Sequence, residues 1–359
     1  MTIETAQSHG SDTLLAIPEG TEHEEVGAIY KQGSGLRAIV AIHSTALGPS
    51  LGGVRFRHYA SAAEGLFDVL RLSKGMSYKS AMAGLDFGGG KAVIIGDPKT
   101  LKSKELLADY ARYVATFQGR YITAEDVGTT QADMDFIGRH TDYVAGRSES
   151  FGGSGDPSPV TAYGVVRAIE ATSEALFGTA SLEGRHVAIN GVGKVGTSLA
   201  RRCAERGAKV TIADISAAAV AAVLADVKAE IVAAESVHAV ECDIYAPCAL
   251  GGALNARTLP QLKCAAVCGA ANNQLDRPDI EEGLAARGIT YVPDYVVNAG
   301  GVINIAYERP SYDAEAAVAH VARIYDTVKS LFDVASATGE RLSVIADRTA
   351  EQRLARGKG

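Results

Sequence analysis

The amino-acid sequence predicts a two-domain α/β protein whose second domain is a doubly wound parallel sheet. Its 359 residues are enough for two domains of ordinary size, each with its own core. The apolar residues are mostly aliphatic and there is no tryptophan, which is typical of buried parallel strands covered by helices. In the second half of the chain strand-like and helix-like segments alternate, and this alternation predicts a parallel sheet.

The first predicted domain, residues 1–148, is expected to combine strands and helices. Residues 1–24 are polar and are expected to be loosely ordered. Beyond them, short runs of aliphatic and β-branched residues bounded by turn-forming residues predict strands. These strands are expected over residues 26–30, 36–43, 53–59, 91–95, 121–124 and 143–145.

Helices are expected between these strands. Ser61 and Glu64 have the spacing of a capping box, and an amphipathic helix should follow as far as Met82. The three glycines at 88–90 predict a turn that leads into the next strand. Another helix is predicted over residues 103–117.

The second predicted domain covers residues 149–335. Residues 148–159 are rich in Gly, Ser and Pro and are expected to form a linker or hinge. Long helices are predicted over residues 161–177 and 313–335, and residues from about 336 to 359 are expected to pack back on the first domain. Between the two long helices, apolar runs predict strands over residues 186–190, 209–214, 244–246, 265–268 and 290–292.

Composition excludes several classes of protein. The net charge of −7 argues against a nucleic-acid partner, whose phosphates require a basic face. No apolar run reaches the roughly 20 residues needed to span a membrane, and residues 1–20 lack the features of a signal peptide. The five cysteines are scattered and form no CxxC pair, so neither a disulfide framework nor a metal site is expected. We therefore expect a cytoplasmic protein.

A glycine motif directly follows the predicted strand 186–190 and opens a helix. The first glycine of such a motif permits a tight turn, the second lets backbone approach a pyrophosphate, and the third allows close packing of helix and strand. Free N–H groups at the start of the helix would bind the phosphates. The motif reads Gly191-Val192-Gly193-Lys194-Val195-Gly196, the GxGxxG pattern of a Rossmann-type dinucleotide-binding domain.

Asp214 ends the next predicted strand, 18 residues after Gly196, where a carboxylate binds the adenosine ribose. Its charge would repel a 2′-phosphate, the following Ile215 is apolar, and no Arg lies nearby. The sequence therefore predicts NAD rather than NADP as the cofactor. The alternative is a glycine turn that binds no ligand, and the strand–loop–helix context argues against it.

A second cluster, of glycines, lysines and carboxylates, lies in the first predicted domain. A P-loop is excluded, because Leu85 stands in place of a glycine and Ala92 in place of Ser or Thr. A partly desolvated lysine near a second cation has a lowered pKa and can act as a base, which makes Lys91 a candidate. Alone, Lys79 could be a solvated surface charge and Asp126 a strand-end or helix-cap residue. The cluster comprises Gly52, Gly53, residues 75–79 and 88–91, Glu125 and Asp126.

Several stretches of the chain together point to one family. They are residues 42–49, 52–53, 75–79, 88–93, 121–129, 246–249, 269–273 and 298–301. They resemble the leucine, valine and phenylalanine dehydrogenases, a branch of the Glu/Leu/Phe/Val amino-acid dehydrogenase superfamily, over nearly the whole chain. The resemblance implies an N-terminal substrate-binding and oligomerisation domain, a Rossmann-type NAD-binding domain and a homo-oligomer.

The resemblance also implies roles for individual residues. Lys79 would bind the substrate carboxylate, aided by the backbone of Gly52 and Gly53. Lys91 would activate water as a general base, and Asp126 would exchange a proton with the departing amine, so that ammonia and a 2-oxo acid are released. Asn272 would help to fix both the substrate and the nicotinamide. The cofactor site would comprise Thr161, Gly191, Val192, Gly193, Lys194, Val195, Gly196, Asp214, Ile215, Ala246, Pro247, Ala270, Asn272 and Asn298.

On the same resemblance, the pocket for the substrate side chain is apolar. No cation is placed to meet a side-chain carboxylate, which disfavours glutamate and favours valine, leucine or isoleucine. Residues 42–48, 244–253 and 267–275 look most like valine dehydrogenases, whereas Val54 departs from the threonine common in relatives. The pocket would be lined by Leu51, Met76, Ala124, Val297 and Val302, and also by Val296.

Three alternatives stay open. A phenylalanine dehydrogenase would use the same mechanism, although Ala124 and Val302 leave less room for a ring than its usual residues. A noncatalytic NAD-sensing module would be expected to lack Lys79, Lys91 or Asp126, and all three are present. A dehydrogenase of 2-hydroxy acids would use a His–carboxylate pair, and no histidine of this chain stands in such a motif.

Overall fold

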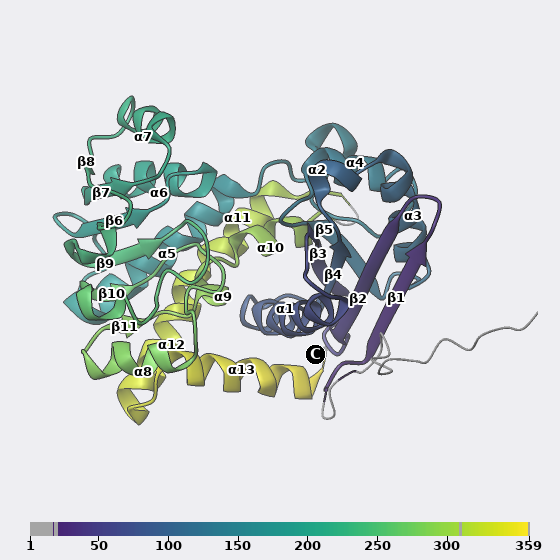
Figure 1. Ribbon diagram of the computed structural model, residues 1–359. Helices are drawn as coiled ribbons and strands as arrows, with labels where there is room; N and C mark the ends of the chain where they lie inside the picture. Colours follow the sequence, from purple (N-terminus) through teal and green to yellow (C-terminus); the bar gives the residue numbers. More distant parts are fainter. Residues whose placement is uncertain (1–16, 18–20, 309–310, 358–359) are drawn as a thin grey trace, which may run out of the picture.

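The computed structural model describes residues 17, 21–308 and 311–357, and it forms two lobes side by side (Figure 1). Each lobe is built on its own β-sheet with helices on both faces, as the predicted two-domain α/β fold requires. The expectation for residues 1–24 falls mostly outside the described residues. The predicted domain boundaries at residues 148 and 335 stay predictions.

The sheet of the first lobe has five strands in the order β1-β2-β4-β3-β5. Strands β3, β4 and β5 run parallel to one another, while β1 and β2 are antiparallel additions at one edge. Functional side chains can therefore gather on one face where the three parallel strands lie together. The strands are β1 (Glu25–Lys31), β2 (Leu36–Ser44), β3 (Ser50–Arg57), β4 (Gly88–Ile95) and β5 (Tyr121–Glu125).

Alternation along the strands gives this sheet two apolar faces. Ile39, Ala41 and Val93 pack against α1, whereas the intervening residues such as Val40 and Ala92 pack against α3. Lys91 has the same parity as Val93, so its side chain lies on the α1 face. The helices of this lobe are α1 (Ala62–Met82), α2 (Pro98–Leu101), α3 (Lys104–Ala115) and α4 (Gln131–Ile137).

The predicted turn at residues 88–90 is wrong, because all three glycines belong to strand β4. None of them has a positive φ, so conformational freedom is not the reason for glycine here. Space is the reason: a Cβ on Gly89 would lie 2.1 Å from the backbone N of Ser77 in α1. Gly89 therefore lets α1 lie close to the sheet, whereas a Cβ on Gly88 would meet the carbonyl oxygen of Ser44 at 1.9 Å and one on Gly90 would meet Tyr121 at 2.7 Å.

Two smaller expectations for this lobe also need correction. Ser61 caps α1 by accepting a hydrogen bond from the N–H of Glu64, but the Glu64 carboxylate accepts from the N–H of Ala60 instead of completing a capping box. The predicted strand 143–145 is a single bridge between Thr123 and Val144. The two backbone hydrogen bonds of Thr123, with Tyr143 and Ala145, join this segment to β5 in one bridge, so it does not form a strand.

The second lobe contains a six-stranded sheet in the order β11-β10-β9-β6-β7-β8, and every pairing in it is parallel. This confirms the doubly wound parallel sheet. The two-residue strand β8 was not predicted, because two exposed residues carry no periodicity. The strands are β6 (His186–Asn190), β7 (Lys209–Ala213), β8 (Glu230–Ile231), β9 (Glu241–Pro247), β10 (Lys263–Val267) and β11 (Thr290–Tyr291).

Helices cover both faces of this sheet and run between the lobes. The longest, α5, starts at Ser158, within the last residues of the predicted linker, and carries the buried apolar face that packs on the sheet. The helices are α5 (Ser158–Phe177), α6 (Lys194–Ala204), α7 (Ala217–Leu224), α8 (Asp279–Ala286), α9 (Asp294–Val297) and α10 (Gly300–Ala306). Among the helices of the described residues, none is long and apolar enough to cross a membrane.

The single helix predicted over residues 313–335 is two helices, α11 (Ala314–Ala322) and α12 (Ile324–Thr338). Between them the N–H of Arg323 bonds to the carbonyl of His320. His320 is itself held at the end of α1, because its Nε2 lies 2.7 Å from the Ala83 carbonyl oxygen. The chain therefore changes direction so that α12 can pack along α5.

The last helix, α13 (Leu342–Arg356), runs from the second lobe back to the first (Figure 1). The Tyr78 hydroxyl donates to Glu351 at 2.7 Å. Arg353 donates to the carbonyls of Ala81 and Leu85 at the end of α1. Helix α1 is thus fixed by the sheet on one side and by α13 on another.

The close approach of α1 to β4 gives a test of the fold. Gly89→Ala is expected to lower the free energy of unfolding by about 1–3 kcal/mol, because the backbone of α1 must move to admit the methyl group. Gly75→Ala is the matched control, since nothing lies within 4 Å of the added Cβ there. That variant is expected to be neutral or more stable by up to about 1 kcal/mol. Urea unfolding followed by circular dichroism measures both, and equal stabilities would contradict this account.

Candidate active site

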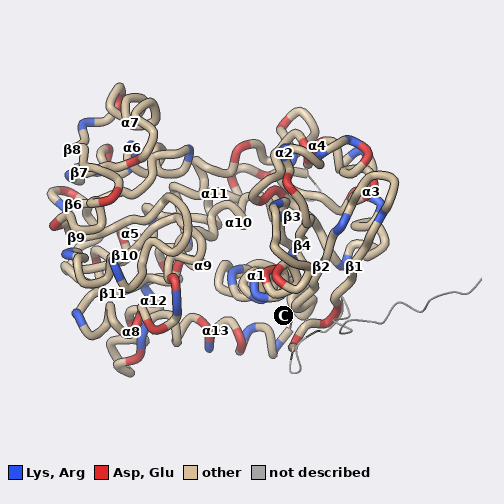
Figure 2. The backbone as a smooth tube through the Cα atoms, viewed as in Figure 1, with Lys and Arg blue, Asp and Glu red and all other residues tan. Residues whose placement is uncertain are grey.

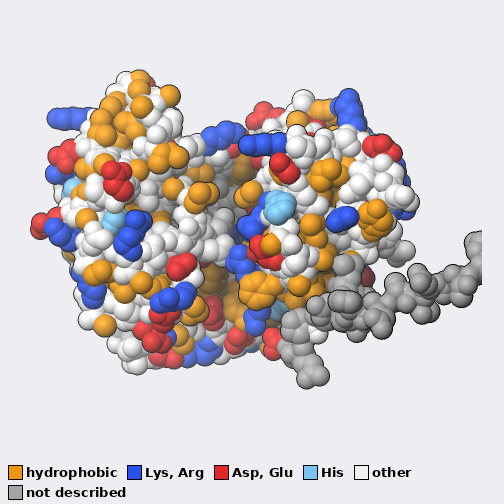
Figure 3. Space-filling model, viewed as in Figure 1, with side chains coloured by type: hydrophobic (Ala, Val, Ile, Leu, Met, Phe, Trp, Pro, Cys, Tyr) orange, Lys and Arg blue, Asp and Glu red, His pale blue; other side chains and the backbone are white. Residues whose placement is uncertain are grey.

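A cavity of about 390 Å³ lies between the two lobes, where the space-filling view shows the surface hollowed (Figure 3). Strands β3, β4 and β5 and helix α1 form one wall, and the second lobe forms the other. Most of the predicted site residues line it together. They are Gly52, Gly53, Met76, Lys79, Lys91, Ala124, Asp126, Thr161, Val195, Ala270, Asn272, Asn298 and Val302.

Some predicted residues do not reach this cavity. Val297 was expected to line the side-chain pocket, but it is fully buried in the core of the second lobe. Leu51 and Val296 are likewise buried, because each lies within a packed apolar cluster. The apolar lining of the cavity instead includes Leu72 and Ile305, which were not predicted.

Lys91 and Asp126 form an ion pair at the floor of the cavity. Their Nζ and Oδ2 atoms are 2.8 Å apart, and Lys91 is buried. Arg55 donates from Nε to the same carboxylate oxygen at 3.2 Å. Burial by itself would raise the pKa of Asp126, but the two cations outweigh it and lower that pKa to about 2. Asp126 is therefore ionised at neutral pH and directly hydrogen-bonded to Lys91.

Lys79 reaches the cavity from α1 and contacts the second lobe. Its Nζ donates to Asn272 Oδ1 at 3.2 Å, and Asn298 Nδ2 donates to the same oxygen at 2.9 Å. Burial lowers the pKa of Lys79 to about 8, and the nearby charge of Lys91 acts in the same direction. Desolvation beside a second cation, the condition that the sequence analysis expected for Lys91, is found at Lys79.

The sequence reasoning missed four ionisable residues that line this cavity: Arg55, Arg71, Asp294 and Tyr295. Arg55 shares a face of β3 with Gly53, so the two-residue period of the strand could have placed it beside the glycines. Asp294 begins the short helix α9, and its Oδ2 accepts from the N–H of Gln274 at 3.0 Å. Burial raises the pKa of Asp294. No local sequence pattern marks this residue.

Charged residues of both signs gather around α1 and the neighbouring strands (Figure 2). Within the described part of the chain, no group of three His, Cys, Asp or Glu side chains could hold a metal ion. The charged groups that line the cavity are the ammonium groups of Lys79 and Lys91, the guanidinium groups of Arg55 and Arg71, and the carboxyl groups of Glu125, Asp126 and Asp294. Such a set can bind a carboxylate and move a proton.

The glycine motif has the geometry of a dinucleotide loop. Gly191 has a φ of 96°, which favours glycine, and a Cβ on Gly196 would lie 1.9 Å from the Gly191 carbonyl oxygen. Nothing lies within 4 Å of the position of a Cβ on Gly193, so backbone is open to a ligand there. All three glycines thus have the properties that the motif requires.

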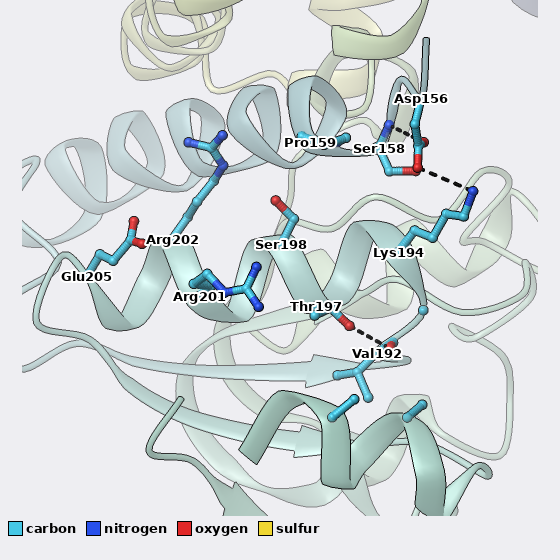
Figure 4. Close-up of a pocket in the computed structure, with 13 residues that line it drawn as sticks. Asp156, Ser158, Pro159, Val192, Lys194, Thr197, Ser198, Arg201, Arg202 and Glu205 are labelled. Carbon is cyan, nitrogen blue, oxygen red and sulfur yellow. Dashed lines mark hydrogen bonds and ion pairs between the residues drawn. The ribbon is translucent and has the colours of Figure 1, made fainter. Parts of the chain in front are cut away.

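A second cavity, of about 710 Å³, opens at the start of α6 beside this loop (Figure 4). It is lined by Gly193, Lys194 and the first residues of α5. The Thr197 hydroxyl donates to the Val192 carbonyl at 2.8 Å and holds the loop in place. Lys194 Nζ lies 3.2 Å from an oxygen of Asp156, so the predicted cofactor residue Lys194 is paired with the linker.

Asp214 follows β7 and holds the loop from the other side. Its Oδ2 accepts from the N–H of Val192 at 2.8 Å, and its Oδ1 accepts from the N–H of Ser216 at 2.8 Å. A third cavity, of about 300 Å³, is lined by Asp214 and by Ile215, whose side chain is 96% exposed. Of the remaining predicted cofactor residues, Ala246 and Pro247 lie at the end of β9 behind these cavities.

These residues fit a nicotinamide dinucleotide. The open backbone at Gly193 suits a pyrophosphate, and the carboxylate of Asp214 suits ribose hydroxyls. Near Lys79, the buried Oδ1 atom of Asn298 has no hydrogen-bond partner among the described residues. An acceptor left unpaired beside the cavity matches the amide donor of a nicotinamide.

Two family models match the chain in succession. Residues 25–143 match the Glu/Leu/Phe/Val dehydrogenase dimerisation domain. Residues 152–223 and 216–318 match the Glutamate/Leucine/Phenylalanine/Valine dehydrogenase model. Leucine dehydrogenase of Geobacillus stearothermophilus is 48% identical over 341 residues, which cover 95% of this chain and 93% of the relative. Valine dehydrogenase of Streptomyces coelicolor is 49% identical over 349 residues, which cover 96% of each.

Solved structures agree with this result. L-tryptophan dehydrogenase from Nostoc punctiforme superposes with a TM-score of 0.83 at 38% identity, covering 94% of this chain and 97% of that one. Hetero-hexameric glutamate dehydrogenase from Thermus thermophilus superposes with a TM-score of 0.77 at 23% identity, covering 94% and 91%, and shares the fold. The chain therefore belongs to the Glu/Leu/Phe/Val dehydrogenase family, within its leucine/valine dehydrogenase branch.

Proposed function

We propose that this protein is an NAD-dependent dehydrogenase that oxidatively deaminates a branched-chain L-amino acid to a 2-oxo acid and ammonia, and catalyses the reverse reaction. One observation carries the proposal. Lys79, Lys91 and Asp126 converge on a single cavity whose opposite wall includes Val195 of the dinucleotide loop and Asn298. The reacting carbon of an amino acid held by the lysines can therefore lie beside a nicotinamide held by the second lobe.

The proposed roles follow from the position of each group. Lys79, on α1, binds the α-carboxylate, and the backbone of Gly52 and Gly53 lies on the same wall. Lys91 removes a proton from the attacking water. Asp126 accepts a hydrogen bond from Lys91 at 2.8 Å, so a proton can pass directly between them before it reaches the departing amine.

NAD, when bound, supplies the acceptor for the hydride that leaves the substrate. The N–H groups at Gly193 and the start of α6 would hold the pyrophosphate. Asp214 would accept from the ribose hydroxyls, while its charge disfavours a 2′-phosphate. Thr161 and Asn298 would contact the nicotinamide amide, with Ala270 and Asn272 beside them.

The cavity also supports the choice of substrate. Its apolar lining includes Met76, Ala124 and Val302, joined by Leu72 and Ile305. The two arginines of the lining, Arg55 and Arg71, are already paired with carboxylates of the protein. An unpaired side-chain carboxylate would be costly to bury there. The curated relatives named above are a leucine and a valine dehydrogenase, which supports a branched aliphatic substrate rather than phenylalanine.

We further propose a homo-oligomer in the cytoplasm. The model that matches residues 25–143 describes a dimerisation domain, and symmetric homo-oligomers are the common assembly of soluble enzymes. All five cysteines are free thiols, as expected for a reducing compartment. The partners of this protein are then copies of itself, its amino acid or 2-oxo acid, ammonia and NAD.

A panel of substrates tests the proposed function. With NAD present, formation of NADH is expected with valine, leucine and isoleucine, and kcat/KM for these is expected to exceed the values for phenylalanine and glutamate by at least about 10-fold. Absorbance of NADH measures each rate. Higher kcat/KM with phenylalanine would favour the alternative substrate, and no turnover with any amino acid would reject a dehydrogenase of this class.

Loss of the proposed base should separate catalysis from binding. Lys91→Ala is expected to lower kcat by about 10²- to 10⁴-fold while the Kd for NADH stays within twofold. Fluorescence of bound NADH gives the Kd and shows that the variant is folded. Lys209→Ala removes an exposed lysine of β7 and serves as the control, with no expected change. Near-normal turnover of Lys91→Ala would reject this role.

Asp214 holds the glycine loop through the Val192 N–H and is proposed to bind the ribose, and one variant can distinguish these two roles. The double change Asp214→Ser and Ile215→Arg is expected to move preference from NAD toward NADP, because a repelling charge is replaced by an attracting one. Binding of both cofactors should also weaken, since the hydrogen bond to the Val192 N–H is lost. Titration with each reduced cofactor measures this, with Asp226→Asn as an exposed control. An unchanged ratio of the two Kd values would contradict the ribose contact.

A further inference from the structure

Asp68 is a buried carboxylate of α1 that lies outside the cavities described above. Its side chain is 9% exposed, and three donors surround it. Arg55 Nη1 and the Tyr59 hydroxyl donate to Oδ2 at 3.1 and 2.8 Å, and Arg71 Nη2 lies 2.7 Å from Oδ1. A buried ionised carboxylate is unfavourable unless it is paired in this way. These three donors stabilise the ionised carboxylate of Asp68 and fix its position.

Both arginines that bind Asp68 also line the active-site cavity. Arg55 uses its Nε to contact Asp126 and its Nη1 to contact Asp68, so one guanidinium spans two carboxylates. A planar guanidinium with both ends held has a fixed direction. If Asp68 no longer held its end, the guanidinium could turn about its remaining contact, and the direction from which it meets Asp126 would no longer be fixed.

We propose that Asp68 is a positioning residue that holds Arg55 against Asp126 and thereby sets the orientation of the acid–base carboxylate. The proposal rests on the role of Asp126 in the proposed function. Asp68 touches neither substrate nor cofactor, and acts only through Arg55. Tyr59 and Arg71 keep Asp68 itself in place.

The charges around Asp126 determine what a change at Asp68 should do. Lys91 and Arg55 contact Asp126 directly, from β4 and β3. Lys79, Glu125 and Tyr121 lie farther away and interact with it through space. Removing the negative charge of Asp68 makes the net charge of the residues around Asp126 more positive. A more positive surrounding favours loss of a proton from the ammonium group of Lys91.

Asp68→Asn keeps the shape of the side chain and removes its charge. The variant is expected to lower kcat for the branched-chain substrate by about 10- to 100-fold, as misplacement of a reacting group does. The Kd for NADH should stay within twofold, and the acid limb of the kcat/KM profile should move to lower pH. A kcat within twofold of the native value would overturn the proposal. The proposal would also be overturned if kcat fell only in proportion to the fraction of unfolded protein and the pH profile of kcat/KM did not move.

Arg55→Lys separates charge from geometry. Lysine keeps the positive charge but cannot span both carboxylates, so kcat should fall as in Asp68→Asn while the acid limb stays near its native position. Arg57→Lys is the matched control: it lies on the same strand and its pair with Glu64 is exposed, so native kcat is expected. Native kcat in Arg55→Lys would overturn the bridging role.

A measurement without turnover distinguishes this proposal from the proposed function. Reductive methylation with formaldehyde and cyanoborohydride modifies neutral amines, and mass spectrometry reports the rate at Lys91. At a fixed pH the rate is expected to be higher in Asp68→Asn than in the native protein. If the native protein oxidised no amino acid, the proposed function would fail. Equal methylation rates at Lys91 would overturn the proposal for Asp68.

Discussion

The close contact of helix α1 with strand β4 is the constraint on which the candidate active site depends. Gly89 admits the backbone of Ser77, and no larger residue could stand there without moving the helix. Two residues farther along each element come Lys79 on α1 and Lys91 on β4, and both line the same cavity. The ammonium groups of two consecutive elements are thus brought together because Gly89 has no side chain to hold α1 away from β4.

Bringing these charges together requires compensation. Asp126 lies against Lys91 and Arg55, and Asp68 lies against Arg55 and Arg71, so positive and negative groups alternate from the cavity floor into α1. The arrangement lowers the pKa of Asp126 to about 2, whereas burial and Lys91 lower the pKa of Lys79 to about 8. Asp126 is therefore ionised at neutral pH, whereas the pKa of Lys79 lies close to neutral pH.

Sequence reasoning succeeded where the interactions are local and failed where they are not. The dinucleotide loop was predictable because Gly191 and Gly196 contact each other within one turn. The glycines of β4 were misread because their close neighbours, such as Ser77 beside Gly89, lie on other elements, and these contacts cannot be inferred from periodicity. The resemblance to a family supplied Lys79, Lys91 and Asp126. Arg55 was overlooked although strand periodicity places it beside Gly53, whereas the proximity of Asp294 to Lys79 is visible only in three dimensions.

The contacts between the lobes differ in strength according to position. Near the linker, the buried Glu308 carboxylate accepts from the N–H groups of Gly146 and Ser154 at 2.9 and 2.7 Å. Across the cavity, Lys79 meets only a neutral amide oxygen of Asn272 at 3.2 Å. A substrate carboxylate would form a charge-assisted hydrogen bond with Lys79, which is stronger than the bond to that amide. On the proposed role of Lys79, substrate therefore displaces the weaker contact while the linker side stays closed, and the cavity can admit its ligand without disturbing α1.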